Sequence, residues 1–477
     1  MRAHVDAPAR PRASPARARP ADCHVTDADR PCYAPRRMGS DTPTLILGAG
    51  LTGLSTALHL GDAGRYRLIE KSDGVGGLAR TRLRPGGFHC DGTGHWLHLR
   101  TPEMRALVER VLDGNLATHA RRARVFSKGV FTHYPFQANT YGLPLDVVSE
   151  CLSGLVKARY EEQLPEPTNY KEWIRKEFGE GICKHFMYPY NEKIYGVPLD
   201  TLATDFAAKY IPRPSVQAVI DGAIGLSKEQ LGYNASFVYP KTGGIGALST
   251  AIHAACPRPA ELEREPVSID LAARVARLAD GEVIRYTHLV STLPLPKLVQ
   301  LALAGNPSQV PDAIVEASKK LRANSVFYFD VAVKGPVTAT NDFHWVYFPE
   351  REFPFYRVGS YSAVERALAP EGHRSYYVEF GHYGEVDPKA FEAPMLDGLR
   401  RAGLLSDQDE LVFCEPSLLD PAYVLFDAHY VEARKTILAW AETQHVTSVG
   451  RYGRWQYNAM EDALLEGKEA AERALRA

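Results

Sequence analysis

The glycines near residue 50 constrain the fold of this chain more than any other feature. A short apolar run, Thr44-Leu-Ile-Leu47, leads into Gly48-Ala-Gly50-Leu-Thr-Gly53, and a helical apolar pattern follows. A second run, Tyr66-Arg-Leu-Ile69, ends in Glu70. This order is typical of a Rossmann-like βαβ unit, in which a strand, a G-x-G-x-x-G turn, a helix, a second strand and an acidic residue follow one another. The sequence therefore predicts an α/β fold with a dinucleotide-binding domain.

Each residue of this motif has its own physical task. Gly48 allows a tight turn, Gly50 lets a pyrophosphate approach the backbone, and Gly53 lets the helix pack closely on the sheet. The helix N-terminus faces the phosphates, and Glu70 can accept hydrogen bonds from a ribose. The alternative is a glycine-rich turn in an ordinary α/β domain.

Further segments favour a flavin over a nicotinamide dinucleotide. A second glycine run, Gly74-Val-Gly-Gly77-Leu-Ala-Arg80, and the segment Asp91-Gly-Thr-Gly94-His95 allow additional close approaches of backbone to an extended cofactor. Together with the segments around Val267 and Gly450, they resemble the FAD-binding domain of the amine-oxidase and protoporphyrinogen-oxidase superfamily. The expected cofactor-binding residues are Gly48, Gly50, Gly53, Glu70, Gly76, Gly77, Leu78, Arg80, Val267, Gly450 and Met460.

Composition excludes several classes of protein. The formal net charge of the 477 residues is −1, which gives no reason to expect nucleic acid as a partner. No run approaches the roughly 20 apolar residues of a membrane span, so no membrane partner is expected. The seven cysteines form no C-x-x-C pair, which favours a reducing cytoplasmic location and suggests no metal site. Residues 1–37 hold eight Arg and no Lys, so residues 1–40 are predicted to be a disordered tail, with Met38 as an alternative start.

The remaining segments predict a three-part organisation. Residues 41–100, 237–320 and 425–477 are expected to form a discontinuous FAD-binding domain. Residues 141–236 carry apolar residues at helical spacing and predict a helical insertion. Residues 101–140 and 321–424, rich in alternating apolar and β-branched residues, predict an antiparallel sheet that forms the substrate domain.

Four unusual segments carry a more specific resemblance. They are Tyr134-Pro-Phe-Gln137, Phe186–Gly196, Tyr347–Arg357 and Gly450–Tyr457. With shorter segments around Asn234 and Tyr430, this ordered set resembles the UDP-galactopyranose mutase family, most closely its eukaryotic branch, over roughly residues 42–475.

The resemblance implies a reaction. The family interconverts UDP-galactopyranose and UDP-galactofuranose without net redox change, with N5 of reduced FAD as the nucleophile. It implies an isomerase with a small nucleotide sugar as its partner. The source of electrons, NADPH or another reductant, and the oligomeric state stay open.

The resemblance also implies roles for individual residues. His95, Arg357 and Arg451 are expected to be catalytic. A diphosphate leaving group needs a guanidinium fork, which Arg357 offers, and uncharged phenolic donors. The expected substrate-binding residues are Tyr134, Phe136, Gln137, Asn191, Tyr195, Asn234, Tyr347, Arg357, Tyr430 and Tyr457.

Several alternatives stay open at this point. The tyrosines could be core residues, Arg357 could pair with a structural carboxylate, and His95 could merely shape a turn. Tyr210 stands where the family has a second diphosphate arginine, with Lys209 and Arg213 as candidate substitutes. The alternative functions are an amine-oxidase-like, FAD-dependent oxidoreductase of a secondary-metabolite pathway, and a catalytically silent flavin-binding protein.

Overall fold

The computed structural model describes residues 42–62, 65–204, 211–226 and 235–476. The expected tail at residues 1–40, together with Lys209, Tyr210 and Asn234, lies outside the described residues. Among the residues described, no helix combines the length and apolar character needed to cross a bilayer.

The first sheet begins with the glycine-motif strand and mixes parallel and antiparallel pairs. Its strand order is β2-β1-β11-β10-β9, with β17 also pairing with β11. β1 runs parallel to β2 and β11, and β17 is parallel to β11, whereas β9, β10 and β11 are antiparallel. The strands are β1 (Thr42–Leu47), β2 (Tyr66–Ile69), β9 (Pro266–Asp270), β10 (Val275–Leu278), β11 (Val283–Ser291) and β17 (Val446–Ser448).

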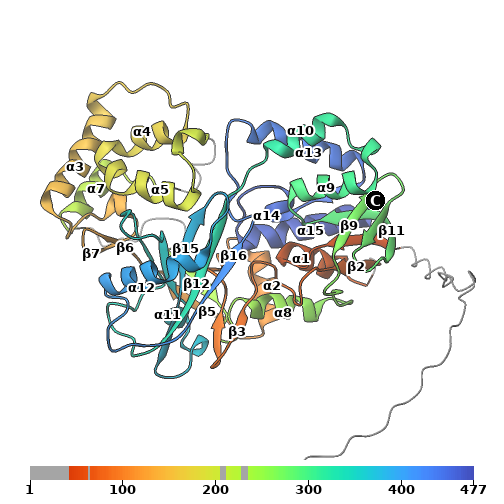
Figure 1. Cartoon of the computed structure of the whole chain (residues 1–477), viewed down its shortest axis with the longest axis horizontal. Coiled ribbons are helices and arrows are strands. Elements are labelled where there is room, and N and C mark those ends of the chain that lie inside the picture. The colour runs from red at the N-terminus through yellow and green to blue at the C-terminus, as the bar shows by residue number, and fades with distance from the viewer. Residues whose placement is uncertain (1–41, 63–64, 205–210, 227–234, 477) are drawn as a thin grey trace, which may run out of the picture. The chain divides into compact units, whose positions relative to one another are not determined.

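Helices cover both faces of this sheet (Figure 1). Because successive side chains of a strand point to opposite faces, Ile46 packs with α1 (Leu51–Leu60), α8 (Gly246–Ala255) and α15 (Met460–Arg476). Its neighbours Leu45 and Leu47 pack on the other face, in the apolar cluster formed with α9 (Leu295–Gly305), α10 (Asp312–Lys320) and α13 (Tyr430–Thr443). Burial on both faces explains why three apolar residues, Leu45, Ile46 and Leu47, follow one another in β1.

The second sheet has the order β16-β12-β15-β14-β13-β6-β7. All its neighbours are antiparallel except β13 and β6, which are parallel, so the expectation of a purely antiparallel sheet is corrected at that pair. One face packs under α12 (Glu392–Arg401), and the other contributes Trp345 and Tyr377 to the cluster around α1. The strands are β6 (Ala123–Ser127), β7 (Val130–His133), β12 (Ser325–Lys334), β13 (Trp345–Tyr347), β14 (Arg357–Ser360), β15 (His373–His382) and β16 (Glu410–Leu419).

Residues 101–122 depart from the expected division. The sequence predicts that they belong to the substrate sheet, but α2 (Pro102–Leu112) packs with α8 in the cluster around α1. β5 (Ala117–Ala120) pairs with β8 (Ser236–Tyr239) outside both large sheets. The apolar face of α2 decides its place, because its buried residues belong to the cluster around α1 and α8 and not to the cluster of the second sheet under α12.

Residues 145–223 contain the helical region. The helices described there are α3 (Leu145–Val156), α4 (Tyr170–Ile182), α5 (Tyr188–Tyr195) and α7 (Val216–Ala223), with π-helical stretches at Lys157–Glu161 and Cys183–Met187. Glycine lets α3 and α4 approach closely, since a Cβ on Gly181 would lie 2.0 Å from the carbonyl oxygen of Glu150. This region is built around its own apolar cluster.

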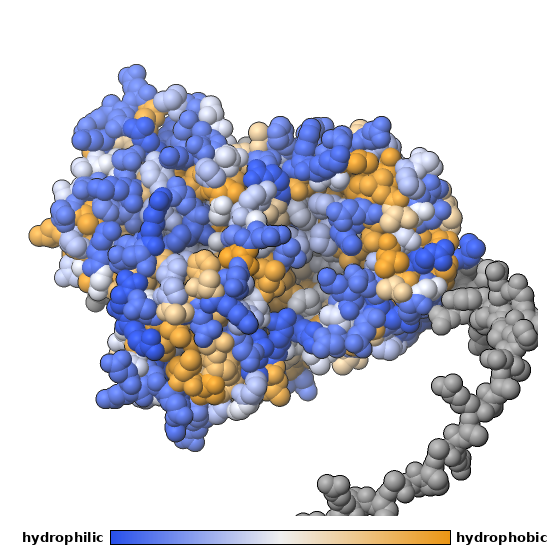
Figure 2. Space-filling view, in the orientation of Figure 1, coloured by the Kyte–Doolittle hydropathy of each residue, from blue (hydrophilic) through white to orange (hydrophobic). Residues whose placement is uncertain are grey.

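Short elements complete the fold. They are β3 (Arg82–Arg84), β4 (Phe88–Cys90), α11 (Tyr361–Val364), α14 (Gly450–Gly453), and 3-10 turns at Phe136–Ala138, Leu199–Thr201, Pro307–Gln309, Arg366–Leu368 and Pro388–Phe391. On the face drawn in Figure 2, hydrophilic side chains predominate and apolar ones gather in separate patches.

Candidate functional site

The glycine turn between β1 and α1 has the geometry that the motif predicts. Gly48 has φ +98°, and a Cβ there would lie 2.2 Å from Oγ1 of Thr292. A Cβ on Gly53 would lie 1.9 Å from the carbonyl oxygen of Gly48. Any side chain at either position would therefore displace the turn or the helix.

A strip of bare backbone lies at the N-terminus of α1. Gly50 caps the helix without a side-chain hydrogen bond to its first N–H groups. A Cβ on Gly77 would lie 3.2 Å from Cα of Gly50, and Gly76 forms a bridge with Gly50. Unsatisfied N–H groups at a helix start, next to glycines, suit a phosphate group. The donor set therefore fits the diphosphate of a dinucleotide.

Glu70 is bound more tightly than the sequence suggests. Its Oε2 accepts from the N–H of Ala49 at 2.8 Å, and its Oε1 accepts from N and Oγ of Ser72 at 2.9 and 2.7 Å. Glu70 thus holds the glycine turn itself. Oε2 keeps a lone pair that can accept from a ribose hydroxyl.

The structure does not bring Val267 to this site. Val267 lies on the strand β9 at the far end of the strand order from β2, with 43% of its surface exposed. Instead, Glu261 and Arg264 lie beside the end of β2, because the N–H of Glu70 donates to the carbonyl of Glu261 and that of Arg264 donates to the carbonyl of Glu70. No periodicity marks this short segment, so the sequence offered no signal for it.

Arg80 and Leu78 lie at the margin of the strip. Arg80 forms an ion pair with the exposed Asp73 at 2.7 Å, and Leu78 is half-buried. Gly450, with φ +84°, packs against α1 on the other side: a Cβ there would lie 2.8 Å from Oγ1 of Thr52. Met460 opens α15, whose Gly467 touches the same first turn of α1.

His95 and two arginines lie close enough to influence one another. Burial, and then the charges of Arg451 and Arg357, lower the pKa of His95 to about 4. The imidazole is therefore neutral near pH 7, and its Nδ1 is buried without a hydrogen-bond partner. An unpartnered buried nitrogen on an imidazole that two guanidinium charges influence indicates a candidate ligand site.

Arg451 is a partly buried cation among aromatic rings. Its guanidinium carbon lies 4.9 Å from the ring centroid of Tyr457 and 5.7 Å from that of Tyr423. Nη1 and Nη2 donate to the carbonyl oxygens of Asn458 and Ala422, both at 3.3 Å, while the buried Nε has no partner. The structure describes no carboxylate in ion-pair contact with Arg451.

Arg357 is paired with a buried carboxylate. Arg357 on β14 lies opposite Glu379 on β15, and Tyr347 on β13 lies opposite Arg357. Nη2 donates to Oε1 of Glu379 at 2.8 Å, and Nε donates to Oε2. The structural ion pair that the sequence left open therefore exists. It uses one edge of the guanidinium and leaves Nη1 for a ligand.

An aromatic wall adjoins this row. The ring of Tyr347 lies 5.0 Å from that of Tyr134 and 5.2 Å from that of Tyr190. Phe186 stacks between Phe136 and Tyr190, at 5.0 Å from each. The structure thus brings together three of the predicted residues, Tyr134, Phe136 and Tyr347.

Other predicted residues are engaged in the helical region. Nε2 of Gln137 donates to the carbonyl of Pro212 at 2.8 Å. The amide of Asn191 accepts from the hydroxyl of Tyr170 at 3.0 Å and donates to the carbonyl of Met187 at 2.7 Å. Tyr195 packs edge-on against Tyr170, with ring centroids 6.2 Å apart. These bonds stabilise the fold.

Tyr423, rather than Tyr430, lies beside the arginines. The hydroxyl of Tyr430 donates to the carbonyl of Trp455 at 2.8 Å, and its ring belongs to the apolar cluster under β1. Burial raises the pKa of Tyr423, and the charge of Arg357 works against this rise. The sequence analysis missed Tyr423, although it lies only seven residues before Tyr430, around which one of the resembling segments lies.

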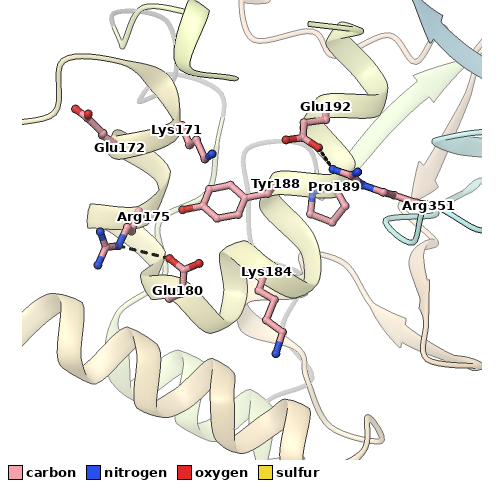
Figure 3. A pocket seen from close by; sticks show the side chains of 9 residues that line it. All are labelled: Lys171, Glu172, Arg175, Glu180, Lys184, Tyr188, Pro189, Glu192 and Arg351. Carbon is pink, nitrogen blue, oxygen red and sulfur yellow. Dashed lines mark hydrogen bonds and ion pairs between the residues drawn. The ribbon is translucent and has the colours of Figure 1, made fainter. Parts of the chain in front are cut away.

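One described hollow lies elsewhere. It has a volume of about 610 Å³ and lies on the helical region, where Tyr188 projects between Lys171 and Glu180 (Figure 3). Seven of its nine lining side chains are charged, with both signs present. Four of them pair with one another, as Arg175–Glu180 and Glu192–Arg351. None of the predicted site residues lines it.

Comparison with known proteins gives a consistent relationship. The family model of the flavin containing amine oxidoreductases matches residues 51–475. A crystal structure of reduced UDP-galactopyranose mutase is 27% identical, with a TM-score of 0.86 over 91% of this chain and 94% of that one.

More distant structures share the fold. Putrescine oxidase bound to putrescine is 15% identical, with a TM-score of 0.61 over 92% of this chain and 100% of that one. A CLA-producing fatty acid isomerase from P. acnes is 14% identical, with a TM-score of 0.59 over 91% and 98% of the two chains.

Proposed function

Because the chain belongs to the flavin containing amine oxidoreductase family, we propose that it is a flavin-dependent mutase that interconverts a UDP-pyranose and a UDP-furanose. The observation that carries the proposal is that two partly buried arginines, Arg357 and Arg451, both exert their charge on neutral His95. Glu379 neutralises one of them. The remaining positive charge favours an anionic substrate and opposes a cationic amine.

FAD fits the bare backbone of the glycine turn. Gly50, Gly76 and Gly77 would admit its diphosphate to the N-terminus of α1, and Glu70 would accept from a ribose hydroxyl. When bound and reduced, FAD would supply the nucleophile for the anomeric carbon. NADPH or another reductant would keep it reduced.

The chain's own residues would hold the departing diphosphate. Nη1 of Arg357 would donate to a phosphate oxygen, because Nε and Nη2 are already bound to Glu379. Tyr347, Tyr423 and Tyr457 would add phenolic donors. Uncharged donors bind a diphosphate less permanently than further cations would, which suits a group that has to leave and return. The wall of Tyr134, Phe136 and Tyr347 is suited to the uridine end.

The experiment compares two redox states. The purified protein is mixed with UDP-galactofuranose, with and without dithionite, and the nucleotide sugars are separated by chromatography. A mutase forms UDP-galactopyranose only in the reduced sample and consumes no oxygen. Equal turnover by the oxidised enzyme contradicts the nucleophilic role of reduced flavin. Steady oxygen uptake with amines, without isomerisation, favours the oxidoreductase alternative.

A further inference from the structure

The hairpin that carries Tyr347 and Arg357 has a long connection. β13 ends at Tyr347 and β14 begins at Arg357, so residues 348–356 join two residues of the site. The N–H of Phe348 donates to the carbonyl of Tyr356 at 2.9 Å, which closes the hairpin directly behind them. Any shift of this connection would therefore move both side chains.

Lys193 binds this connection from outside the sheet. It lies on α5, and its Nζ donates to the carbonyl oxygens of Glu350 at 2.9 Å, Phe353 at 2.8 Å and Phe355 at 2.8 Å. Because an ammonium has three N–H donors, these three bonds to residues 350–355 use all of them. The structure describes no carboxylate in ion-pair contact with Lys193. Its charge is balanced by carbonyl dipoles, as a bound cation would be.

Helix α5 is itself anchored next to the site. Nδ2 of Asn324 donates to the carbonyl oxygens of Ile194 at 2.7 Å and Tyr195 at 3.2 Å, which ties the end of the helix to the residue just before β12. The ring of Tyr190, from the same helix, lies 5.2 Å from that of Tyr347 and 6.2 Å from that of Tyr356. Thus α5 contacts the hairpin through both Lys193 and Tyr190.

We propose that Lys193 is a positioning residue, which couples α5 to the hairpin and thereby sets the places of Tyr347 and Arg357 for the substrate diphosphate. The role of Tyr347 and Arg357 toward the substrate diphosphate rests on the proposed function, whereas the coupling of α5 to the hairpin does not. Lys193 touches no substrate. It acts through the three carbonyl groups that it holds.

The surrounding charges modulate the ammonium. Burial lowers the pKa of Lys193 to about 7, and the nearby Glu350 and Glu352 oppose this effect. Glu350 is also paired with Lys128 at 3.4 Å, and Glu192 of α5 is paired with Arg351. A neutral amine has only two donors. Above neutral pH, one of the three carbonyl groups therefore loses its partner and the hairpin loosens.

The first experiment is hydrogen–deuterium exchange of the flavin-loaded protein. Lys193→Met keeps the length of the side chain but removes its donors and charge. We expect at least tenfold faster exchange in residues 348–358, with unchanged exchange around the glycine turn. Lys171→Met is the matched control, because Lys171 is exposed and lies over Tyr188. Unchanged exchange in Lys193→Met contradicts the coupling.

The second experiment measures UDP binding to the reduced protein. Lys193→Met should weaken UDP roughly tenfold with unchanged FAD content, and Lys193→Arg should restore part of the loss. Wild-type affinity should fall as the pH rises from 6 to 9, and this fall should be absent in Lys193→Met. If Lys193→Met does not fold, Lys193→Gln, which keeps an amide donor, serves for both experiments.

The outcomes separate the two proposals. A wild type that binds no UDP contradicts the proposed function, while the exchange experiment still judges the coupling. A Lys193→Met protein that melts lower but binds UDP as well as wild type at every pH shows a purely structural lysine and overturns the inference.

Discussion

Arg357 and Glu379 lie directly opposite each other on neighbouring strands, and two nitrogens of the guanidinium donate to the two carboxylate oxygens. The carboxylate is almost completely buried. This pair fixes the orientation of the arginine and leaves its Nη1 out of the bonds to Glu379. It also reduces the net positive charge next to a ligand bound there.

Glu379→Gln should strengthen UDP binding and weaken the fold. The amide keeps the shape of the side chain but leaves the buried charge of Arg357 without compensation, and breaking a buried pair costs about 3–5 kcal/mol. We expect a lower melting temperature, with a larger rise on adding UDP than in the wild type. Thermal unfolding with and without UDP measures both. A variant that UDP stabilises less than the wild type contradicts this charge balance.

Arg357→Ala should weaken UDP binding by at least tenfold. Hydrogen bonds to charged groups contribute about 1.5–3 kcal/mol each, and the variant also leaves Glu379 buried and unpaired. Arg357→Lys should recover only part of the affinity, because an ammonium cannot form the fork. Calorimetric titration with UDP tests both variants. If UDP affinity stays unchanged in Arg357→Ala, the oxidoreductase alternative becomes preferable.

Tyr423→Phe and Tyr430→Phe should have opposite consequences. Tyr423 lies beside Arg451 and its pKa is influenced by the charge of Arg357, so losing its hydroxyl should weaken UDP severalfold and leave stability nearly unchanged. The hydroxyl of Tyr430 bonds to the carbonyl of Trp455, so its loss should lower the melting temperature and spare UDP affinity. Equal UDP affinities of the two variants would refute the assignment of Tyr423 to the site.

Glu70→Ala should reduce FAD retention more than loss of a ribose contact alone. The carboxylate also holds the N–H groups of Ala49 and Ser72, so the turn should loosen as well. Flavin absorbance after extensive dialysis reports retention. Val267→Ala is the control, because Val267 is exposed on β9. Full flavin content in Glu70→Ala would argue against both roles of Glu70.

Stability should fall on mild acidification. Burial lowers the pKa of His95 and His288 to about 4 and that of His344 to about 3. Since the unfolded chain binds these protons near pH 6.5, stability falls as the pH drops from about 6.5 toward 4. Asp91, whose pKa burial raises to about 6, acts in the opposite direction but is outnumbered.

The melting temperature should therefore drop by several degrees between pH 7 and pH 5. His288→Gln isolates one contribution at a distance from the glycine turn, because His288 bonds to Thr447 between β11 and β17. Its melting temperature should depend less on pH than that of the wild type. An identical pH dependence in the two proteins would exclude His288 as a source.

The sequence by itself determined the cofactor-binding turn. Gly48, Gly50, Gly53 and Glu70 lie within about two dozen consecutive residues, and their spacing is dictated by one turn of backbone and one crossover helix. Local chemistry therefore predicts local geometry. The helical character of residues 145–223 was predictable for the same reason, since a period of 3.6 residues is visible within a single helix.

Only the tertiary structure decided which side chains lie together around Arg357 and Arg451. Arg357 meets Glu379 through the register of two strands, and Lys193 reaches residues 350–355 from a distant helix. Tyr423 and Tyr430 are seven residues apart, yet one lies beside the arginines and the other in the apolar core. Such contacts depend on strand register and on packing between segments remote in sequence, so they cannot be predicted from the order of residues along one segment.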